Sequence, residues 1–239
     1  TGEQGDLVSI SGKISGGGSS TLTVTDATIL GSAAKIKLSA TILKTSVQSK
    51  TKTTKLMKQL KVTSGTTDAY GTRPKDDTIS LGRGDVFKLV AVFDSEEAST
   101  DALAPEFTTS NQSGTFTRGE KITGATSGAT GRIIDTSSPM SYVSTNSLTF
   151  TTEKITGESS DATATITATT DGDIVITGKY LLDTGQRDNY YDIARIVRKP
   201  NASTPLGQLL VVYDFFAHGT GDAFTVDSYT PIAGQMEYD

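Results

Sequence analysis

The stretch LGQLLVVYDFF, from Leu206 to Phe216, is the most hydrophobic run of this chain and decides the fold. It is too short to be a capped helix, and its apolar residues follow one another without a helical period, which is typical of a strand buried on both faces. We therefore expect this run to form a central strand that anchors the core.

The rest of the chain favours the same class of structure. Threonine and serine are abundant, and together with valine and isoleucine they suit a pleated, half-buried surface. Few windows carry apolar residues at a helical period. Three alternating segments between residues 7 and 43, LVSISGKIS, TLTVTDATIL and KIKLSATIL, are separated by glycine and serine and predict a meander. The sequence therefore predicts an all-β protein.

An internal repeat lies in the middle of the chain. FTRGEKITGATSGATGRII, residues 116–134, aligns with FTTEKITGESSDATATIT, residues 150–167, so that Glu120 falls 33 positions before Glu153 (153 − 120). A period of this length indicates a duplicated supersecondary unit. Each unit has the pattern of a hairpin, which cannot bury its own apolar face alone. Two such hairpins facing each other predict a small barrel or sandwich.

These patterns predict how the chain is divided. We expect an Ig-like or related β-sandwich whose first part is residues 1–96 and whose returning strands are residues 172–239. Between them, residues 97–171 form an inserted β module made of the two hairpin-like repeats. Polar flanks at 95–106 and 169–173 mark the two ends of the insertion.

Lysines recur at positions 50, 52, 55, 58 and 61 in the run KTKTTKLMKQLK. Their spacing fits neither a helix face nor a strict strand alternation. The threonine-rich context favours an exposed strand with the lysines outward, where they discourage pairing of sheet edges. The alternative is a contact to anionic lipopolysaccharide or to an acidic neighbouring subunit.

Two motifs in the last quarter of the chain carry a family resemblance: LDTGQRDNYYD at 182–192 and YDFFAHGTGDAFTVDSY at 213–229. The segment from Tyr180 to Tyr229 resembles one in virion structural proteins of contractile-tailed bacteriophages, cyanophages especially. The repeat units resemble inserts in the same proteins. The resemblance implies a component of a tail fibre or baseplate, located in the virion tail, that docks with other tail and baseplate proteins and forms a homo-oligomer. It also implies that the chain is a segment of a larger virion protein.

The same segment supplies the candidate site residues. We expect Asp183 and Asp188 to accept backbone N–H groups in turns, with Arg187 paired to one of them, and not to bind calcium, because their spacing differs from that of the known calcium loop. Asp85 is expected to cap a turn. One of Tyr190 and Tyr191 should point into the core from a strand and the other outward. The candidate interface and architectural residues are Arg187, Asp183, Asp188, Tyr190, Tyr191, Asp214, Phe215, Phe216 and His218.

Other functions are disfavoured. A net charge of −5 argues against a nucleic-acid partner, which requires clustered cations, and the apolar runs are too short to span a membrane. Cysteine is absent, and the single His218, expected in a turn with a backbone partner, lies in no nucleophile motif. We therefore predict a protein that is not an enzyme, with no catalytic residues, cofactor or metal. The alternative function is a carbohydrate-binding adhesin module that contacts a glycan of the host cell surface.

Overall fold

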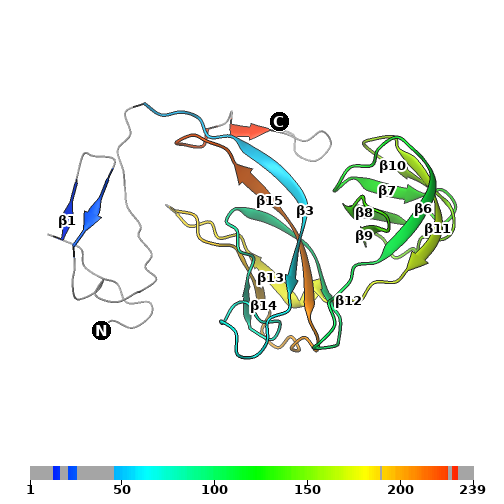
Figure 1. Cartoon of the computed structure of the whole chain (residues 1–239), viewed down its shortest axis with the longest axis horizontal. Helices are drawn as coiled ribbons and strands as arrows, with labels where there is room; N and C mark the ends of the chain where they lie inside the picture. The colour runs from blue at the N-terminus through cyan, green and yellow to red at the C-terminus, as the bar shows by residue number, and fades with distance from the viewer. Residues whose placement is uncertain (1–12, 17–20, 26–45, 189, 226–227, 231–239) are drawn as a thin grey trace. The chain divides into compact units, whose positions relative to one another are not determined.

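The computed structural model describes residues 13–16, 21–25, 46–188, 190–225 and 228–230, and these residues form an all-β protein (Figure 1). The chain divides into two compact units, Thr1–Leu43 and Lys44–Asp239. In the first unit, β1 (Ile14–Ser15) pairs antiparallel with β2 (Thr23–Val24). The third segment of the expected meander, KIKLSATIL, lies outside the described residues. Within them, no helix is long and apolar enough to cross a membrane.

The larger unit contains a five-stranded sheet in the order β12-β5-β15-β3-β16. Its strands are β3 (Lys52–Val62), β5 (Val86–Asp94), β12 (Ile174–Val175), β15 (Leu209–His218) and β16 (Tyr229–Thr230). β15 lies in the middle of this sheet, and seven consecutive residues from Leu209 to Phe215 are buried. The prediction of a central, buried strand from the run at 206–216 is therefore confirmed.

A second sheet packs on the first. It has the order β13-β14-β4, from β13 (Tyr180–Asp183), β14 (Arg195–Arg198) and β4 (Thr78–Ser80), and a short 3-10 turn (Thr177–Lys179) precedes β13. One apolar core joins the two sheets, with Ile79 and Ile196 from the smaller sheet against Val211 from the larger. The two sheets therefore form a β-sandwich, while its Ig-like topology stays a prediction.

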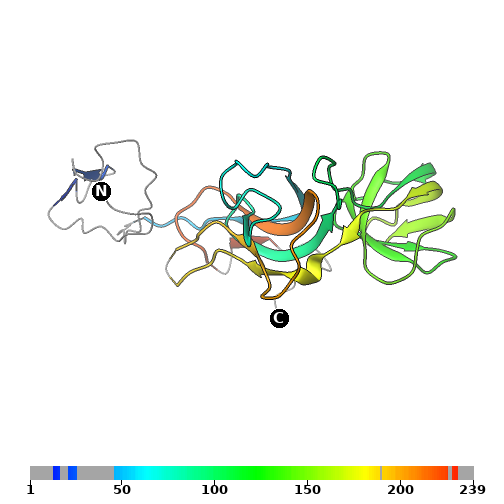
Figure 2. The same cartoon turned by 90° about the horizontal axis from the view of Figure 1, so that it is seen from below.

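Six further strands close into a barrel in the order β10-β11-β6-β9-β8-β7 (Figure 2). They are β6 (Glu106–Ser113), β7 (Lys121–Gly124), β8 (Thr130–Asp135), β9 (Met140–Ser144), β10 (Lys154–Gly157) and β11 (Thr163–Thr170). The barrel has its own core, in which Phe107, Tyr142 and Phe150 pack with ring centroids 5.1–5.7 Å apart. The domain boundaries expected at 96 and 171 stay a prediction.

The two repeats meet inside the barrel around a local two-fold axis. β7 of the first repeat pairs antiparallel with β10 of the second, so that Thr123 lies opposite its repeat equivalent Thr156. Across this axis, the glutamate carboxylate of each repeat binds the turn of the other repeat. Glu120 accepts hydrogen bonds from the backbone N (3.2 Å) and Oγ (2.8 Å) of Ser160 in the turn of the second repeat. Glu153 accepts the equivalent bonds from Ser127 at 2.9 and 2.5 Å.

This exchange explains the glycines of the repeated KITG motif. A Cβ at Gly124 would lie 2.6 Å from Glu153 Oε1, and a Cβ at Gly157 would lie 2.6 Å from Glu120 Oε2. Both glutamates are almost completely buried, at 2% and 5% exposure. Each hairpin thus needs the other both for its apolar face and for the polar groups of its turn.

Acid is expected to weaken the barrel through Glu153. Burial alone would raise its pKa, but hydrogen bonds from Ser127, Thr126 and Thr151 outweigh burial and lower the pKa to about 2. The stabilisation is therefore complete above the unfolded pKa of 4.5 and is lost as the pH falls from 4.5 towards 2. This pH-dependent stabilisation by Glu153 amounts to about 3 kcal/mol at most. Denaturant unfolding of the wild type and of Glu153→Gln at pH 7 and pH 3 tests this: an equally steep loss in both proteins would contradict it.

The barrel also packs against the larger sheet of the sandwich. Ile134 of β8 belongs to one apolar cluster with Met57 of β3, Phe93 of β5 and Val212 of β15. A polar contact adds to it, because Arg132 Nη1 lies 3.7 Å from the buried Asp214 Oδ2. Asp214 thus belongs to the junction between barrel and sandwich.

Two expectations about local structure were wrong. Tyr190 and Tyr191 do not belong to a strand, because β14 starts only at Arg195, and their exposed fractions are 37% and 45%. The lysine run does form a strand, β3, but not all its lysines point outward, since Lys52 is 2% exposed.

Candidate functional site

The most unusual polar group of the described chain is a buried ion pair at one end of the larger sheet. Lys52 is the first residue of β3, and Asp85 immediately precedes β5. Lys52 Nζ lies 2.6 Å from Asp85 Oδ2, and each side chain is only 1% exposed. Asp85 has a φ of 57°, a left-handed conformation that aspartate tolerates better than most residues. Asp85 therefore forms an ion pair, and the expectation that it caps a turn was wrong.

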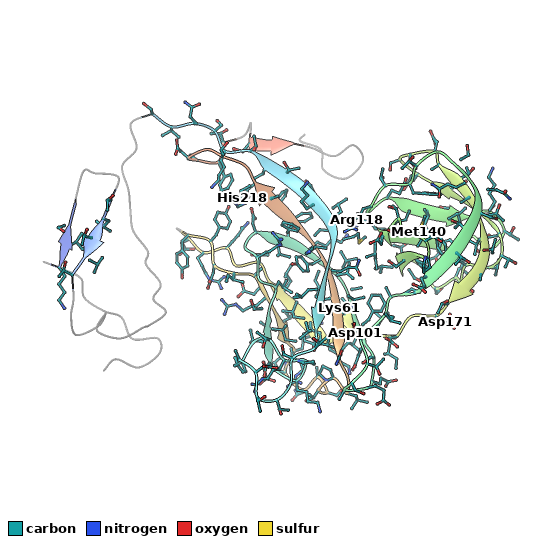
Figure 3. All side chains as sticks on the ribbon, in the orientation of Figure 1. Lys61, Asp101, Arg118, Met140, Asp171 and His218 are labelled. Carbon is teal, nitrogen blue, oxygen red and sulfur yellow. The ribbon has the colours of Figure 1, made fainter. Side chains whose placement is uncertain are left out.

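Two further side chains contact the Asp85 carboxylate. His218 Nε2 lies 2.6 Å from Oδ2, and Gln186 Nε2 donates to Oδ1 at 3.1 Å. Burial alone would raise the pKa of Asp85, but hydrogen bonds from Lys52 and His218 outweigh it and hold the pKa below its usual value. The expectation of a turn histidine bonded to backbone was wrong: His218, labelled in Figure 3, ends β15, and its side chain contacts a carboxylate.

Aromatic rings surround the ammonium group of Lys52. Its Nζ lies 4.5 Å from the ring centroid of Phe224, 4.9 Å from that of Phe216 and 5.4 Å from that of Tyr191. The Phe224 ring also packs edge-on against His218, with centroids 4.7 Å apart. Cations are attracted to ring faces, most strongly where water is excluded. We call this group the Lys52 cluster, made up of Lys52, Asp85, Gln186, Tyr191, Phe216, His218 and Phe224.

The segment between β13 and β14 brings Gln186 and Tyr191 to the cluster. The two residues form an isolated antiparallel bridge. Gly185, with φ 79°, allows this close approach, because a Cβ there would lie 2.2 Å from the Asp192 carbonyl oxygen. Ala194 N then donates to Arg83 O at 2.7 Å and ties the segment to the residues before Asp85.

An ion-pair network holds the same segment on its outer side. Arg187 binds Asp183 through two hydrogen bonds, each 2.9 Å long, and Arg195 Nη2 lies 2.8 Å from Asp192 Oδ2. The bonds from Arg187, together with a backbone bond from Gly185, outweigh burial and lower the pKa of Asp183 to about 2. The carboxylates of Asp183 and Asp192 therefore form ion pairs with arginines.

The remaining predicted residues lie elsewhere. Asp188 and Tyr190 are exposed near the ion-pair network. Phe215 is in the sandwich core, with the Arg83 guanidinium 4.6 Å above its ring. Asp214 lies at the barrel junction, where Met57 N donates to its Oδ1 at 2.7 Å. The structure therefore brings Tyr191, Phe216 and His218 together in one cluster. Arg187 and Asp183 lie beside it. The other four predicted residues, Asp188, Tyr190, Asp214 and Phe215, belong to neither group.

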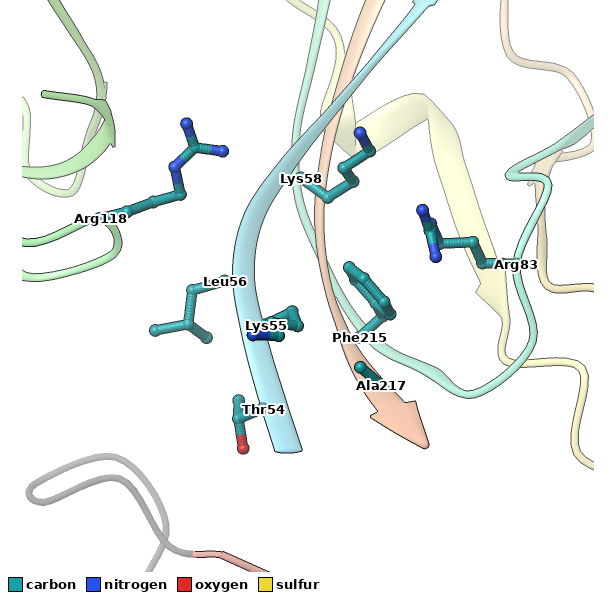
Figure 4. A pocket seen from close by; sticks show the side chains of 8 residues that line it. All are labelled: Thr54, Lys55, Leu56, Lys58, Arg83, Arg118, Phe215 and Ala217. Carbon is teal, nitrogen blue, oxygen red and sulfur yellow. The ribbon is translucent and has the colours of Figure 1, made fainter. Parts of the chain in front are cut away.

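A cationic groove of about 570 Å³ lies along β3 (Figure 4). Its lining combines four cations with apolar and hydroxyl groups: Thr54, Lys55, Leu56, Lys58, Arg83, Arg118, Phe215 and Ala217. Among the residues that the structure describes, no carboxylate lines it, although the chain as a whole has a net charge of −5. Within this described part, the hydroxyl of Thr54 is buried without a hydrogen-bond partner. The groove is therefore suited to an anionic group.

Comparison with known proteins yields no match: no protein-family model, no curated protein and no solved structure is similar to this chain at a significant level. The geometry of the site therefore carries the functional argument together with the resemblance of its sequence motifs.

Sequence reasoning missed Lys52, Asp85, Gln186 and Phe224 as members of one site. Lys52 was placed in an exposed lysine run, and Asp85 in a turn. Their partners come from segments far apart in the chain, and the register that sets Lys52 opposite His218 across β3 and β15 is a tertiary property. The only local signal was the spacing of Phe216 and His218, which places both on one face of a strand.

Proposed function

We propose that this protein is a structural component of a bacteriophage tail fibre or baseplate and acts by docking with other subunits in the virion. The resemblance of residues 180–229 to phage virion proteins carries the proposal. In the fold, this segment supplies β13, β14 and the central strand β15, together with five members of the Lys52 cluster. The proposal gives these motif residues an architectural role and names no catalytic residue.

Exposed apolar side chains on the same segment support a docking role. Leu181, Tyr190, Tyr191 and Ile193 are between 37% and 53% exposed. All four belong to the stretch 181–193, and patches of exposed apolar side chains are a feature of sites of association with other proteins. Leu206, which comes later in the sequence, is 61% exposed. The proposal is that companion subunits cover this segment and that a homo-oligomer forms in the assembly.

Light scattering coupled to size-exclusion chromatography tests this proposal. We expect the full chain to form an oligomer and Leu181→Asp/Ile193→Asp to shift it towards monomer, because charges would have to be buried in the contact. The matched control is Leu148→Asp in the barrel, which is 49% exposed and should leave the oligomer intact. A monomer at all concentrations that also fails to bind co-expressed tail proteins would count against the proposal.

The cationic groove favours a second candidate function, an adhesin that binds an anionic glycan of the host surface. On a glycan array, this function requires binding of acidic glycans that Lys55→Ala/Lys58→Ala removes. Lys121→Ala/Lys154→Ala changes the net charge equally on the barrel and should have no effect. An array without binding, together with oligomerisation, supports the structural role over the adhesin.

A further inference from the structure

We propose that Lys52 and Asp85 condense into an intramolecular amide, which joins Lys52 Nζ to Asp85 Cγ and releases one water molecule. The two groups are placed for this reaction, because Nζ lies 2.6 Å from Oδ2 and both side chains are 1% exposed. By contrast, the side chains of the Lys61–Asp101 pair at the other end of β3 are 58% and 46% exposed. The proposal is independent of the proposed virion function.

Condensation would remove two opposite charges from a site that excludes water. A buried ion pair contributes little net stability, because the loss of hydration of both charges offsets their attraction. Here the rings of Phe216, Phe224 and Tyr191 take the place of water around Nζ. An amide removes both charges from this site. Exclusion of water also protects the bond from hydrolysis.

The cluster also provides the groups that such a condensation needs. His218 Nε2 lies 2.6 Å from the same Oδ2 that Lys52 contacts, and histidine gains and loses a proton at physiological pH. The amide nitrogen of Gln186 donates to the other oxygen, Oδ1. Oδ2 is therefore placed to accept protons and leave as water, while Oδ1 becomes the carbonyl oxygen of the product.

The reaction balances without a further reactant. The ion pair is the predominant form, and the reaction starts from its minor neutral form, in which one proton has moved from the Lys52 ammonium to Oδ2 and leaves a neutral amine and a neutral carboxyl group. The Nζ lone pair then attacks Cγ, and negative charge develops on Oδ1 facing the Gln186 amide. His218 takes the second proton from Nζ and delivers it to Oδ2. The Cγ–Oδ2 bond breaks, and Oδ2 leaves as water.

Position lowers the barrier. Reacting groups held in contact behave as if present at effective molarities of about 10⁵–10⁸ M, so that the two side chains need not first be brought together and oriented. The step happens once per chain and is a self-modification without turnover. The product joins the start of β3 to the start of β5, two strands that lie on opposite sides of β15.

Intact mass spectrometry of the purified, denatured full chain tests the proposal. We expect the wild type to weigh one water molecule less than its sequence. Proteolysis should release a branched peptide in which Lys52 is joined to Asp85. Lys52→Met and Asp85→Ala should have the full mass of their sequences. The matched control Lys61→Met removes a lysine from the same strand and should still lose one water.

A wild-type protein that folds and keeps its full sequence mass after prolonged incubation overturns the proposal. So does a loss of water that maps elsewhere, for example to a cyclised aspartate at Asp171-Gly172. Because the deciding result comes from the wild type, poor folding of a variant does not weaken the test. His218→Ala and Gln186→Ala assign the roles: in a time course after refolding, both should form the product more slowly than the wild type.

Discussion

Asp85→Ala is expected to destabilise the protein by about 3–5 kcal/mol, the cost of removing one partner from a buried ion pair. The substitution takes the carboxylate away from Lys52, His218 and Gln186, in a site that is only 1% exposed. The loss is expected whether the two side chains meet as ions or as an amide, because an amide that ties two strands also restricts the unfolded chain. Urea unfolding followed by circular dichroism measures it.

Two controls isolate this effect. Glu96 is exposed and shares the left-handed backbone of Asp85, with a φ of 58°, so that Glu96→Ala measures the cost of alanine in that conformation. Asp101→Ala removes an exposed carboxylate and should cost less than about 1 kcal/mol. If Asp85→Ala costs no more than these two variants, the buried pair does not hold this end of the sheet.

The second large effect is expected at Asp214. Next to Asp214, the pairing of β15 shifts its register with both of its neighbours, β3 and β5. On the β3 side, Leu56 and Met57 together lie opposite this one residue. Met57, with φ 53°, points its N–H at the Asp214 carboxylate. Asp214→Ala leaves that buried N–H without its acceptor and should cost about 2–3 kcal/mol.

The matched variant Asp214→Asn separates the hydrogen bond from the charge. Burial raises the pKa of Asp214, so its charged form gains little from this site. Asparagine keeps an oxygen acceptor for Met57 N–H and should cost less than about 1 kcal/mol. Equal losses in the two variants, measured by denaturant unfolding at pH 7, would show that the charge and its contact with Arg132 matter more than the acceptor.

Local patterns allowed much of the fold to be predicted. An apolar run at 206–216 predicted the central strand, and the duplicated KITG motif predicted a unit of paired hairpins. Both signals work because strand burial and turn chemistry depend on neighbouring residues. The exchange of Glu120 and Glu153 between the repeats did not follow from the motif, since it depends on which hairpin faces which.

The candidate site was predicted less well for the same physical reason. A lysine in KTKTTKLMKQLK has no local mark that it is buried. Its burial follows from the pairing of β3 with β15, which places Lys52 opposite His218, and from the approach of Asp85 and Phe224. Asp214 carried a clearer signal, because an aspartate inside an apolar run requires a buried partner.

The most direct test of the docking function is an electron cryo-microscopy map of the native assembly that contains this chain. The account predicts that copies of the chain contact one another or other tail proteins through the segment 181–193, in which Leu181, Tyr190, Tyr191 and Ile193 are exposed in the isolated chain. A map in which this segment faces solvent in every copy, while a substrate occupies a cleft of the chain, would contradict the account.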